Sequence, residues 1–254
     1  MIRMKTQHTS HHAAVQMRPL TARSVVLSVL LGAHPPQLSS RELVRLAALF
    51  EISEATLRVA LTRMVSAGDL LRDDSTYRLS DRLVERQRRQ DDAVQPVTKV
   101  WRGAWEMAVV ISTGRGAAER AELRTRLTKL RLAELREGVW LRPANLKRAP
   151  RPEFDGVVQL FVAHSEEPAS EIVTQLWDLA SWQGIANVLL VRLSDADRPA
   201  DRFTIAAAVV RHLLADPVLP DALLPEDWPG AALRSAYVAY QEELAALMRS
   251  TLSS

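Results

Sequence analysis

The sequence has no cysteine among its 254 residues, which excludes disulfide frameworks and thiolate-based sites. It also has no apolar run of the ~18 to 20 residues needed to cross a bilayer, and residues 1–19 lack the apolar segment of a secretory signal. No glycine-rich phosphate loop, nucleophile elbow or zinc-spaced set of histidines and cysteines is present. We therefore expect a cytoplasmic protein with no membrane contact, metal or cofactor.

The net charge is only +3 at pH 7, but it is unevenly distributed along the chain. Residues 1–92 hold 14 basic and 10 acidic side chains, residues 93–150 hold 12 and 5, and residues 151–254 hold 7 and 15. The arginine excess over the first 150 residues indicates an anionic partner there, whereas the acidic remainder faces protein or solvent. Charge alone does not identify that partner.

Residues 1–19 are polar and carry three histidines, His8, His11 and His12. Because this segment has no hydrophobic period to bury, we expect a flexible tail. An N-terminal metal site is the alternative, but no neighbouring cysteine or carboxylate completes a set of ligands. We favour the solvated tail.

Three short amphipathic helices and a hairpin follow the tail. The hydrophobic period indicates helices over residues 21–32, 39–50 and 53–68, the second of them opened by a capping box. The turn-forming sequence DDST between two short apolar runs then indicates a tight hairpin. The order helix, helix, helix, hairpin predicts a winged helix-turn-helix domain over residues 20–92.

The outward face of the third helix carries no carboxylate along its centre. At about 100° per residue, small and hydroxylated side chains occupy the central strip, and arginines flank it. Short side chains let a helix approach base edges closely, and flanking arginines reach guanine edges or phosphates. The expected DNA contacts of this helix are Ala55, Thr56, Arg58, Val59, Thr62, Arg63 and Ser66.

Two arginines of the hairpin, Arg72 and Arg78, flank its turn and are candidate phosphate contacts. Asp73 and Asp74 at the tip repel phosphates, so the wing is a weaker candidate than the helix. The alternative for the whole motif is an ordinary helical hairpin with solvated arginines, because such motifs also occur in proteins that do not bind DNA.

After a charged connecting segment, residues 81–100, strand and helix patterns alternate and predict an α/β domain over residues 93–165. We expect strands at WEMAVVIS, EGVWLRP and VVQLFVAHS, with one long helix, GAAERAELRTRLTKLRLAEL, between the first two. Helical patterns fill residues 166–254, and we expect a separate acidic domain there for dimerisation or ligand enclosure. The predicted fold class is α+β in three domains.

Three separated segments carry a resemblance to a known family. They are FEISEATLRVALTRMVSAGDLLR with its hairpin, the W-x-G-x-W of residues 101–105 joined with LAELREGVWLRP, and the long, unusual ADPVLPDALLPEDWPG. With these segments the chain resembles, from about residue 20 to 250, the PaaX family of transcriptional repressors, which is named for phenylacetic acid catabolism.

The resemblance implies a winged-helix N-terminal domain, a central ferredoxin-like domain similar to the small CRISPR-associated nuclease fold, and a helical C-terminal domain. It also implies a homodimer on a palindromic operator, which represses a catabolic operon until an acyl-CoA effector such as phenylacetyl-CoA releases the DNA. It places Arg58 and Arg63 on the recognition helix. Lys129 and Arg131 are speculative effector contacts, and the recurrent structural positions are Trp101, Trp105, Gly138, Trp140, Pro143, Trp228, Pro229 and Gly230.

Two other functions compete with a repressor. A metal-dependent nuclease needs carboxylates at the end of the first central strand to hold the cation, but that strand ends in Val110, Ile111, Ser112 and Thr113. We therefore expect no nuclease activity and no enzyme of another class. A structural adaptor that keeps the fold but binds only protein is the second alternative.

Overall fold

The computed structural model describes residues 20–147, 154 and 156–253. The predicted flexible tail and its three histidines lie outside this range. Within it, no helix is both long and apolar enough to cross a membrane.

The N-terminal part is a winged helix, as the sequence predicts. Its sheet has the order β1-β3-β2 with antiparallel neighbours, and the short strand β1 is an element that the sequence pattern did not reveal. Thr21, Ser39 and Ser53 cap the three helices with their side chains, which fixes where each helix begins. The elements are α1 (Ala22–Gly32), β1 (Gln37–Ser39), α2 (Ser40–Leu49), α3 (Glu54–Ser66), β2 (Leu70–Asp73) and β3 (Thr76–Leu79).

A fourth helix, α4 (Asp81–Val94), occupies most of the charged connecting segment. Buried Gln87 holds it to the end of α1, because its side-chain amide donates to the carbonyl oxygens of Leu30, Leu31 and Ala33 over 3.3, 3.2 and 2.8 Å. The final carbonyls of a helix have no partner within the helix. Gln87 therefore closes the C-terminal end of α1 and makes α4 part of the winged-helix module.

The central domain is a four-stranded antiparallel sheet with the order β5-β6-β4-β7, the strand order of a ferredoxin-like fold. The helix expected to reach Leu135 ends at Lys129 instead, and the LAEL segment forms a strand that the sequence analysis missed. The reason is Arg131, whose φ of 60° breaks the helix, so that the following residues pair with β6. The elements are β4 (Trp105–Val110), α5 (Ala117–Lys129), β5 (Ala133–Arg136), β6 (Val139–Pro143) and β7 (Val158–Ala163).

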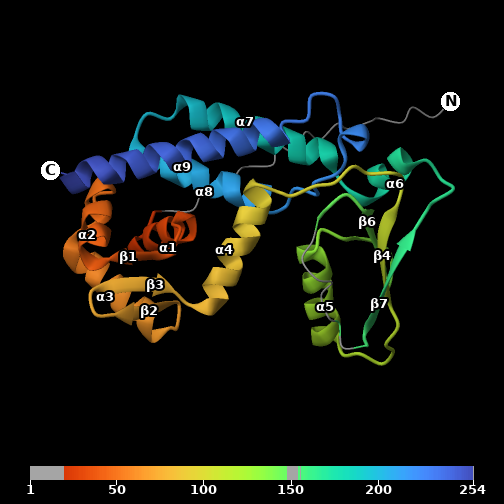
Figure 1. Cartoon of the computed structure of the whole chain (residues 1–254), viewed down its shortest axis with the longest axis horizontal. Coiled ribbons are helices and arrows are strands. Elements are labelled where there is room, and N and C mark those ends of the chain that lie inside the picture. The colour runs from red at the N-terminus through yellow and green to blue at the C-terminus, as the bar shows by residue number, and fades with distance from the viewer. Residues whose placement is uncertain (1–19, 148–153, 155, 254) are drawn as a thin grey trace, which may run out of the picture.

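Each face of this sheet packs against a helix (Figure 1). Ala108 and Trp140 point towards α5, while their neighbours Met107 and Leu141 point to the opposite face, as the two-residue period of a strand requires. That second face is covered by α6 (Ala169–Leu176). Although α6 follows residue 166, it thus packs with the central domain rather than with the C-terminal helices.

The remaining helices do not form the separate domain that we expected. They are α7 (Leu179–Asp195), α8 (Pro199–Leu213), the short 3-10 helix η1 (Asp221–Leu223) and α9 (Gly230–Ser253). Residues of α7, α8 and α9 share one hydrophobic core with those of α1 to α4. The rings of Phe50 and Phe203, for example, lie 4.7 Å apart. The sequence pattern shows which face of a helix is apolar but not which partner covers it.

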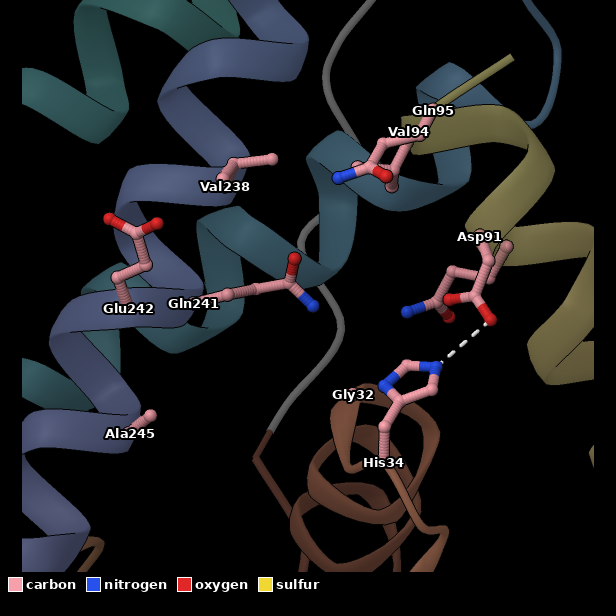
Figure 2. A pocket seen from close by; sticks show the side chains of 10 residues that line it. Gly32, His34, Asp91, Val94, Gln95, Val238, Gln241, Glu242 and Ala245 are labelled. Atoms are coloured by element: carbon pink, nitrogen blue, oxygen red, sulfur yellow. Dashed lines mark hydrogen bonds and ion pairs between the residues drawn. The ribbon is translucent and has the colours of Figure 1, made fainter. Parts of the chain in front are cut away.

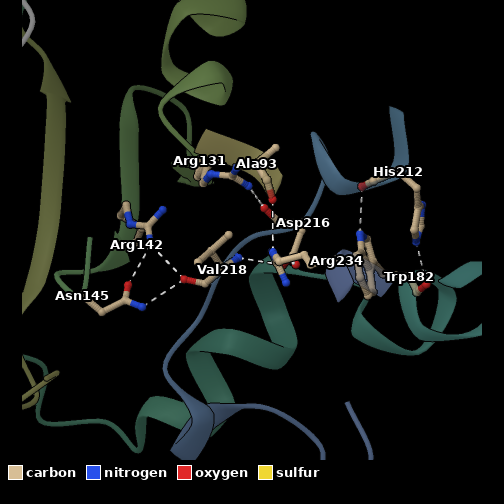
Figure 3. Close-up of polar contacts among 9 residues, drawn as sticks. All are labelled: Ala93, Arg131, Arg142, Asn145, Trp182, His212, Asp216, Val218 and Arg234. Atoms are coloured by element: carbon tan, nitrogen blue, oxygen red, sulfur yellow. Dashed lines mark hydrogen bonds and ion pairs between the residues drawn. The ribbon is translucent and has the colours of Figure 1, made fainter. Parts of the chain in front are cut away.

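A buried polar joint connects the three parts of the chain (Figure 3). Asp216, only 1% exposed, accepts hydrogen bonds from Arg234 over 2.5 Å and from the backbone N–H of Val218 over 2.8 Å. Arg131 of the central domain donates to the carbonyl oxygen of Asp216, and Arg234 also donates to Ala93 of α4 over 3.1 Å. The joint therefore links the winged-helix part, the central domain and the C-terminal helices.

Three stacked rings lie beside this joint. Trp182 stacks between His212 and Trp228, with ring centroids 4.4 and 4.5 Å away. A Cβ atom on Gly230 would lie 2.6 Å from Nε1 of Trp228, which explains the glycine that ends the DWPG sequence. Trp228 and Gly230 are thus structural, as the sequence analysis supposes.

His212 gives the fold a pH dependence. Burial lowers its pKa below the ordinary value of 6.5, and the bond to the Trp182 backbone and the charge of Asp216 oppose this shift less strongly. In the unfolded chain this histidine takes up its proton at a higher pH than in the folded protein. Its contribution to stability is therefore complete above about pH 6.5 and falls as the pH drops from there towards the folded-state pKa.

We expect a His212→Phe variant, which keeps a ring against Trp182 and cannot titrate, to lose less stability on acidification than the wild type. Thermal melts of both proteins at a series of pH values below 7 measure the difference in slope. Parallel curves would show that His212 does not contribute to the pH dependence.

Candidate DNA interface

Helix α3 presents its predicted contact face to solvent. Leu57, Leu61 and Met64 are at most 3% exposed and anchor the opposite side of the helix in the core. Val59, by contrast, is 51% exposed, although a large apolar side chain is normally buried. The seven expected contacts are all exposed: Ala55, Thr56, Arg58, Val59, Thr62, Arg63 and Ser66.

The two arginines of this face differ in their surroundings. Arg58 forms an ion pair with Glu54 one turn earlier, a contact that the sequence analysis did not include. Arg63 makes no ion pair with any residue that the structure describes, and its side chain is exposed. Arg63 is therefore available to an anionic partner as it stands, whereas Arg58 must first share or leave Glu54.

The hairpin register places the two wing arginines on opposite faces. Arg72 lies opposite Tyr77, whereas Arg78 lies opposite Leu71, and successive strand residues point to opposite sides. Arg72 donates to the carbonyl oxygen of Asp74 over 2.9 Å and lies 5.7 Å from the Tyr77 ring centre. It therefore supports the turn, and the two arginines do not form one phosphate-binding surface.

The start of α2 joins the wing tip and adds a candidate that the sequence analysis missed. The backbone N–H and hydroxyl of Ser40 donate to the carbonyl oxygen of Ser75 over 2.6 and 2.9 Å. Arg41 follows in the first turn of α2 and is exposed. The capping box marks the N-terminus of this helix in the sequence. It could have indicated Arg41 as a candidate contact, because backbone N–H groups at a helix N-terminus favour phosphate.

The candidate surface lies on the far side of the molecule from α7 and α9 (Figure 1). Helix α3 and the β2–β3 hairpin are adjacent, and the long helix α9 packs over the other end of α2. No described segment of the chain covers the outer face of α3. A duplex can therefore approach α3 without a rearrangement of the described part of the chain.

The two speculative effector contacts differ in accessibility. Lys129, the last residue of α5, is exposed. Arg131 lies just after the helix and donates to the backbone oxygen of Asp216. The guanidinium of Arg131 is therefore partly engaged within the chain, whereas Lys129 faces solvent.

The end of the first central strand contains no carboxylate, as the sequence already indicated. Ser112 and Thr113 follow β4. Among the residues that the structure describes, no group of three or more histidines and carboxylates is placed to hold a metal ion.

Comparison with known proteins covers most of the chain. Three family models match: "PaaX-like protein" at residues 21–83, "PaaX protein central Cas2-like domain" at residues 98–171, and "PaaX-like protein C-terminal domain" at residues 179–254. The chain is also similar to the solved structure of the uncharacterized protein Rv0674 from Mycobacterium tuberculosis. The identity is 51% and the TM-score 0.80, over 92% of this chain and 100% of that one.

None of the curated proteins compared with the chain matches it. The family models nevertheless follow one another in the order of the observed modules and leave only short gaps between them. The chain therefore belongs to the PaaX family, and membership of this family suggests a regulatory protein.

Proposed function

We propose that this protein is a DNA-binding transcriptional repressor of a catabolic operon that acts in the bacterial cytoplasm. The observation that carries the proposal is the exposed outer face of α3, where small and hydroxylated side chains lie between Arg58 and Arg63. An α-helix fits the major groove, and arginine forms paired hydrogen bonds with guanine there. Membership of the PaaX family agrees with this function.

The direct test is a gel shift with the duplex that flanks the protein's own gene, compared with a random duplex of equal length. We expect the flanking duplex to bind at least 10³-fold more tightly, as is typical of specific recognition. Affinity for both duplexes should fall steeply with salt, because neutralising phosphates releases counterions. No shift with either duplex at low salt would refute DNA binding and favour the adaptor.

We further propose that a small acyl-CoA, such as phenylacetyl-CoA, releases the protein from DNA. The basic central domain supports this proposal, because exposed Lys129 and neighbouring arginines of α5 favour a phosphate-bearing ligand. Titration of the protein–DNA complex with CoA esters and with free CoA tests it. Release by the esters alone is expected, and no release by any ester would contradict the proposal.

We also propose that the protein binds its operator as a homodimer. Among the described strands, β7 pairs only with β4, and residues 157–163 carry no charge. Phe161 and Val162 on this strand are 39% and 56% exposed. Uncharged edge strands readily pair with another chain, and antiparallel pairing of two β7 strands gives the two-fold symmetry of a closed dimer.

A Val162→Lys variant should therefore sediment as a monomer at a concentration where the wild type is a dimer, because a lysine at an edge opposes strand pairing. Val188→Lys, at a 43% exposed position of α7, is the matched control and should remain dimeric. If Val162→Lys is as dimeric as the wild type, β7 is not the dimer interface.

We propose no enzymatic activity. The end of β4 offers no carboxylate for the metal that phosphodiester cleavage requires. Incubation of plasmid with the protein and Mg²⁺ or Mn²⁺ tests this proposal. Cleavage by the wild type that a substitution in the central domain abolishes would overturn it.

A further inference from the structure

A buried carboxylate follows the end of α3. Asp69 is only 3% exposed, and its backbone N–H donates to the carbonyl oxygen of Met64 over 2.9 Å, while Gly68 donates to Val65 over 3.0 Å. With Gly68 at a φ of 69°, these two bonds form a Schellman motif, which closes the C-terminal end of a helix. The position of Asp69 is therefore fixed relative to α3.

Two arginines from other helices meet this carboxylate. Arg23, in the first turn of α1, donates to Oδ2 over 2.6 Å, and Arg82, in the first turn of α4, donates to Oδ1 over 2.5 Å. The backbone N–H of Ser80, just before α4, also donates to the backbone oxygen of Asp69 over 3.0 Å. The side chains of Arg23, Asp69 and Arg82, which we call the Asp69 triad, thus tie the starts of α1 and α4 to the end of α3.

The two arginines of the Asp69 triad remain open to solvent. The side chains of Arg23 and Arg82 are 60% and 70% exposed, and each makes one hydrogen bond to Asp69, which leaves the other N–H groups of the guanidinium for a second acceptor. One carboxylate balances only one of the two positive charges, so the triad stays cationic. Asp81, the exposed carboxylate next to Arg82 in the sequence, points about 100° away from it around α4.

The Asp69 triad lies on the side of the molecule that carries α3 and the wing. Helix α4 begins beside the sheet of the wing and runs from there towards α9 (Figure 1), and α1 packs against α3. Ser66, on the proposed contact face, lies three residues before Asp69. A helix in the major groove has a phosphate backbone on either side, about 12 Å apart. Cationic groups beside α3 therefore face phosphates rather than bases.

The helices that carry the two arginines are also joined at their other ends. His34, just after α1, contacts Asp91 of α4 over 3.1 Å (Figure 2), and Gln87 of α4 closes the end of α1. The two helices are thus fixed to each other near both ends. The Asp69 triad therefore holds its guanidiniums on a rigid support.

We propose that Arg23 and Arg82 bind backbone phosphates of the operator, and that Asp69 is the positioning residue that holds both guanidiniums in place beside α3. This inference rests on the proposed DNA binding and extends it to two helices outside α3 and the wing. Arginine pairs with phosphate through two parallel hydrogen bonds, and phosphate contacts fix the register of a protein on the duplex. Because the triad is tied to α3, it sets how that helix enters the groove.

The salt dependence of binding tests the two arginines. Fluorescence anisotropy of the full chain is measured with operator and random duplexes over about 50 to 200 mM salt. Arg23→Ala and Arg82→Ala should each reduce the slope of log K against log salt by about 0.9 on both duplexes, the value for one phosphate. Arg82→Lys keeps the charge and should retain the wild-type slope.

The matched control is Arg88→Ala. Arg88 lies on the same helix, is 72% exposed and likewise pairs with a carboxylate, that of Glu85, but it lies further from the wing along α4. This substitution should leave the slope unchanged on both duplexes.

Asp69→Asn should act with the opposite sign on the random duplex. Removal of the negative charge makes the triad more cationic, so the slope on the random duplex should become steeper by about 0.9, and affinity for this duplex should not fall. The ratio of operator to random affinity should fall several-fold, because the guanidiniums lose their fixed place. A residue that only held the fold together would weaken binding to both duplexes alike.

Three results would contradict the proposal in different ways. Slopes that Arg23→Ala and Arg82→Ala leave as unchanged as Arg88→Ala does would mean that the triad is only structural. An equal loss of affinity for both duplexes in Asp69→Asn would overturn the positioning role. Failure of the wild type to bind either duplex would refute the proposed DNA binding itself.

Discussion

Arg63→Ala is expected to weaken binding to the operator by about 1 to 3 kcal/mol if the guanidinium contacts a guanine edge, and Arg58→Ala by a similar or smaller amount. Arg63 makes no ion pair with a described residue, whereas Arg58 must share or leave Glu54 when it binds DNA. Fluorescence anisotropy with operator and random duplexes measures the effect.

The two duplexes distinguish the kinds of contact. Loss of a base contact weakens operator binding alone, whereas loss of a phosphate contact weakens both and reduces the salt dependence. Arg192→Ala removes an exposed arginine from α7 on the other side of the molecule and should change neither affinity. Unchanged affinity after both Arg58→Ala and Arg63→Ala would remove α3 from the interface.

Asp216→Ala is expected to lower the free energy of unfolding by about 3 to 5 kcal/mol, the cost of breaking a buried ion pair from one side. The substitution leaves Arg234, whose side chain is only 17% exposed, without its carboxylate. It also removes the acceptor for the Val218 N–H. Urea unfolding followed by tryptophan fluorescence measures the loss, because Trp182 and Trp228 lie next to the joint.

The matched control is Asp221→Ala, five residues later in the same connection, where the side chain is exposed. Exposed substitutions of this kind usually change stability by less than about 0.5 kcal/mol. A loss for Asp216→Ala as small as for Asp221→Ala would mean that the joint does not hold the three parts of the chain together.

Much of the winged helix was predictable because its signals are local. Serine and threonine caps, a hydrophobic period and a two-residue turn each act within a few residues. The helical period of about 100° per residue correctly placed Leu57 and Leu61 inside and Arg58 and Arg63 outside. The end of α5 was predicted wrongly, because the left-handed φ of Arg131 has no signature in a non-glycine residue.

The sequence by itself determined the order of the winged-helix, central and C-terminal helical segments, the family and the exposed face of α3, since each follows from local periodicity or contiguous motifs. Only the tertiary structure decided that α7 to α9 share a core with the winged helix, that Arg58 pairs with Glu54, and that Arg131 meets Asp216. The reason is that an amphipathic pattern specifies an apolar face without specifying its partner. Contacts between distant residues depend on how those faces pack.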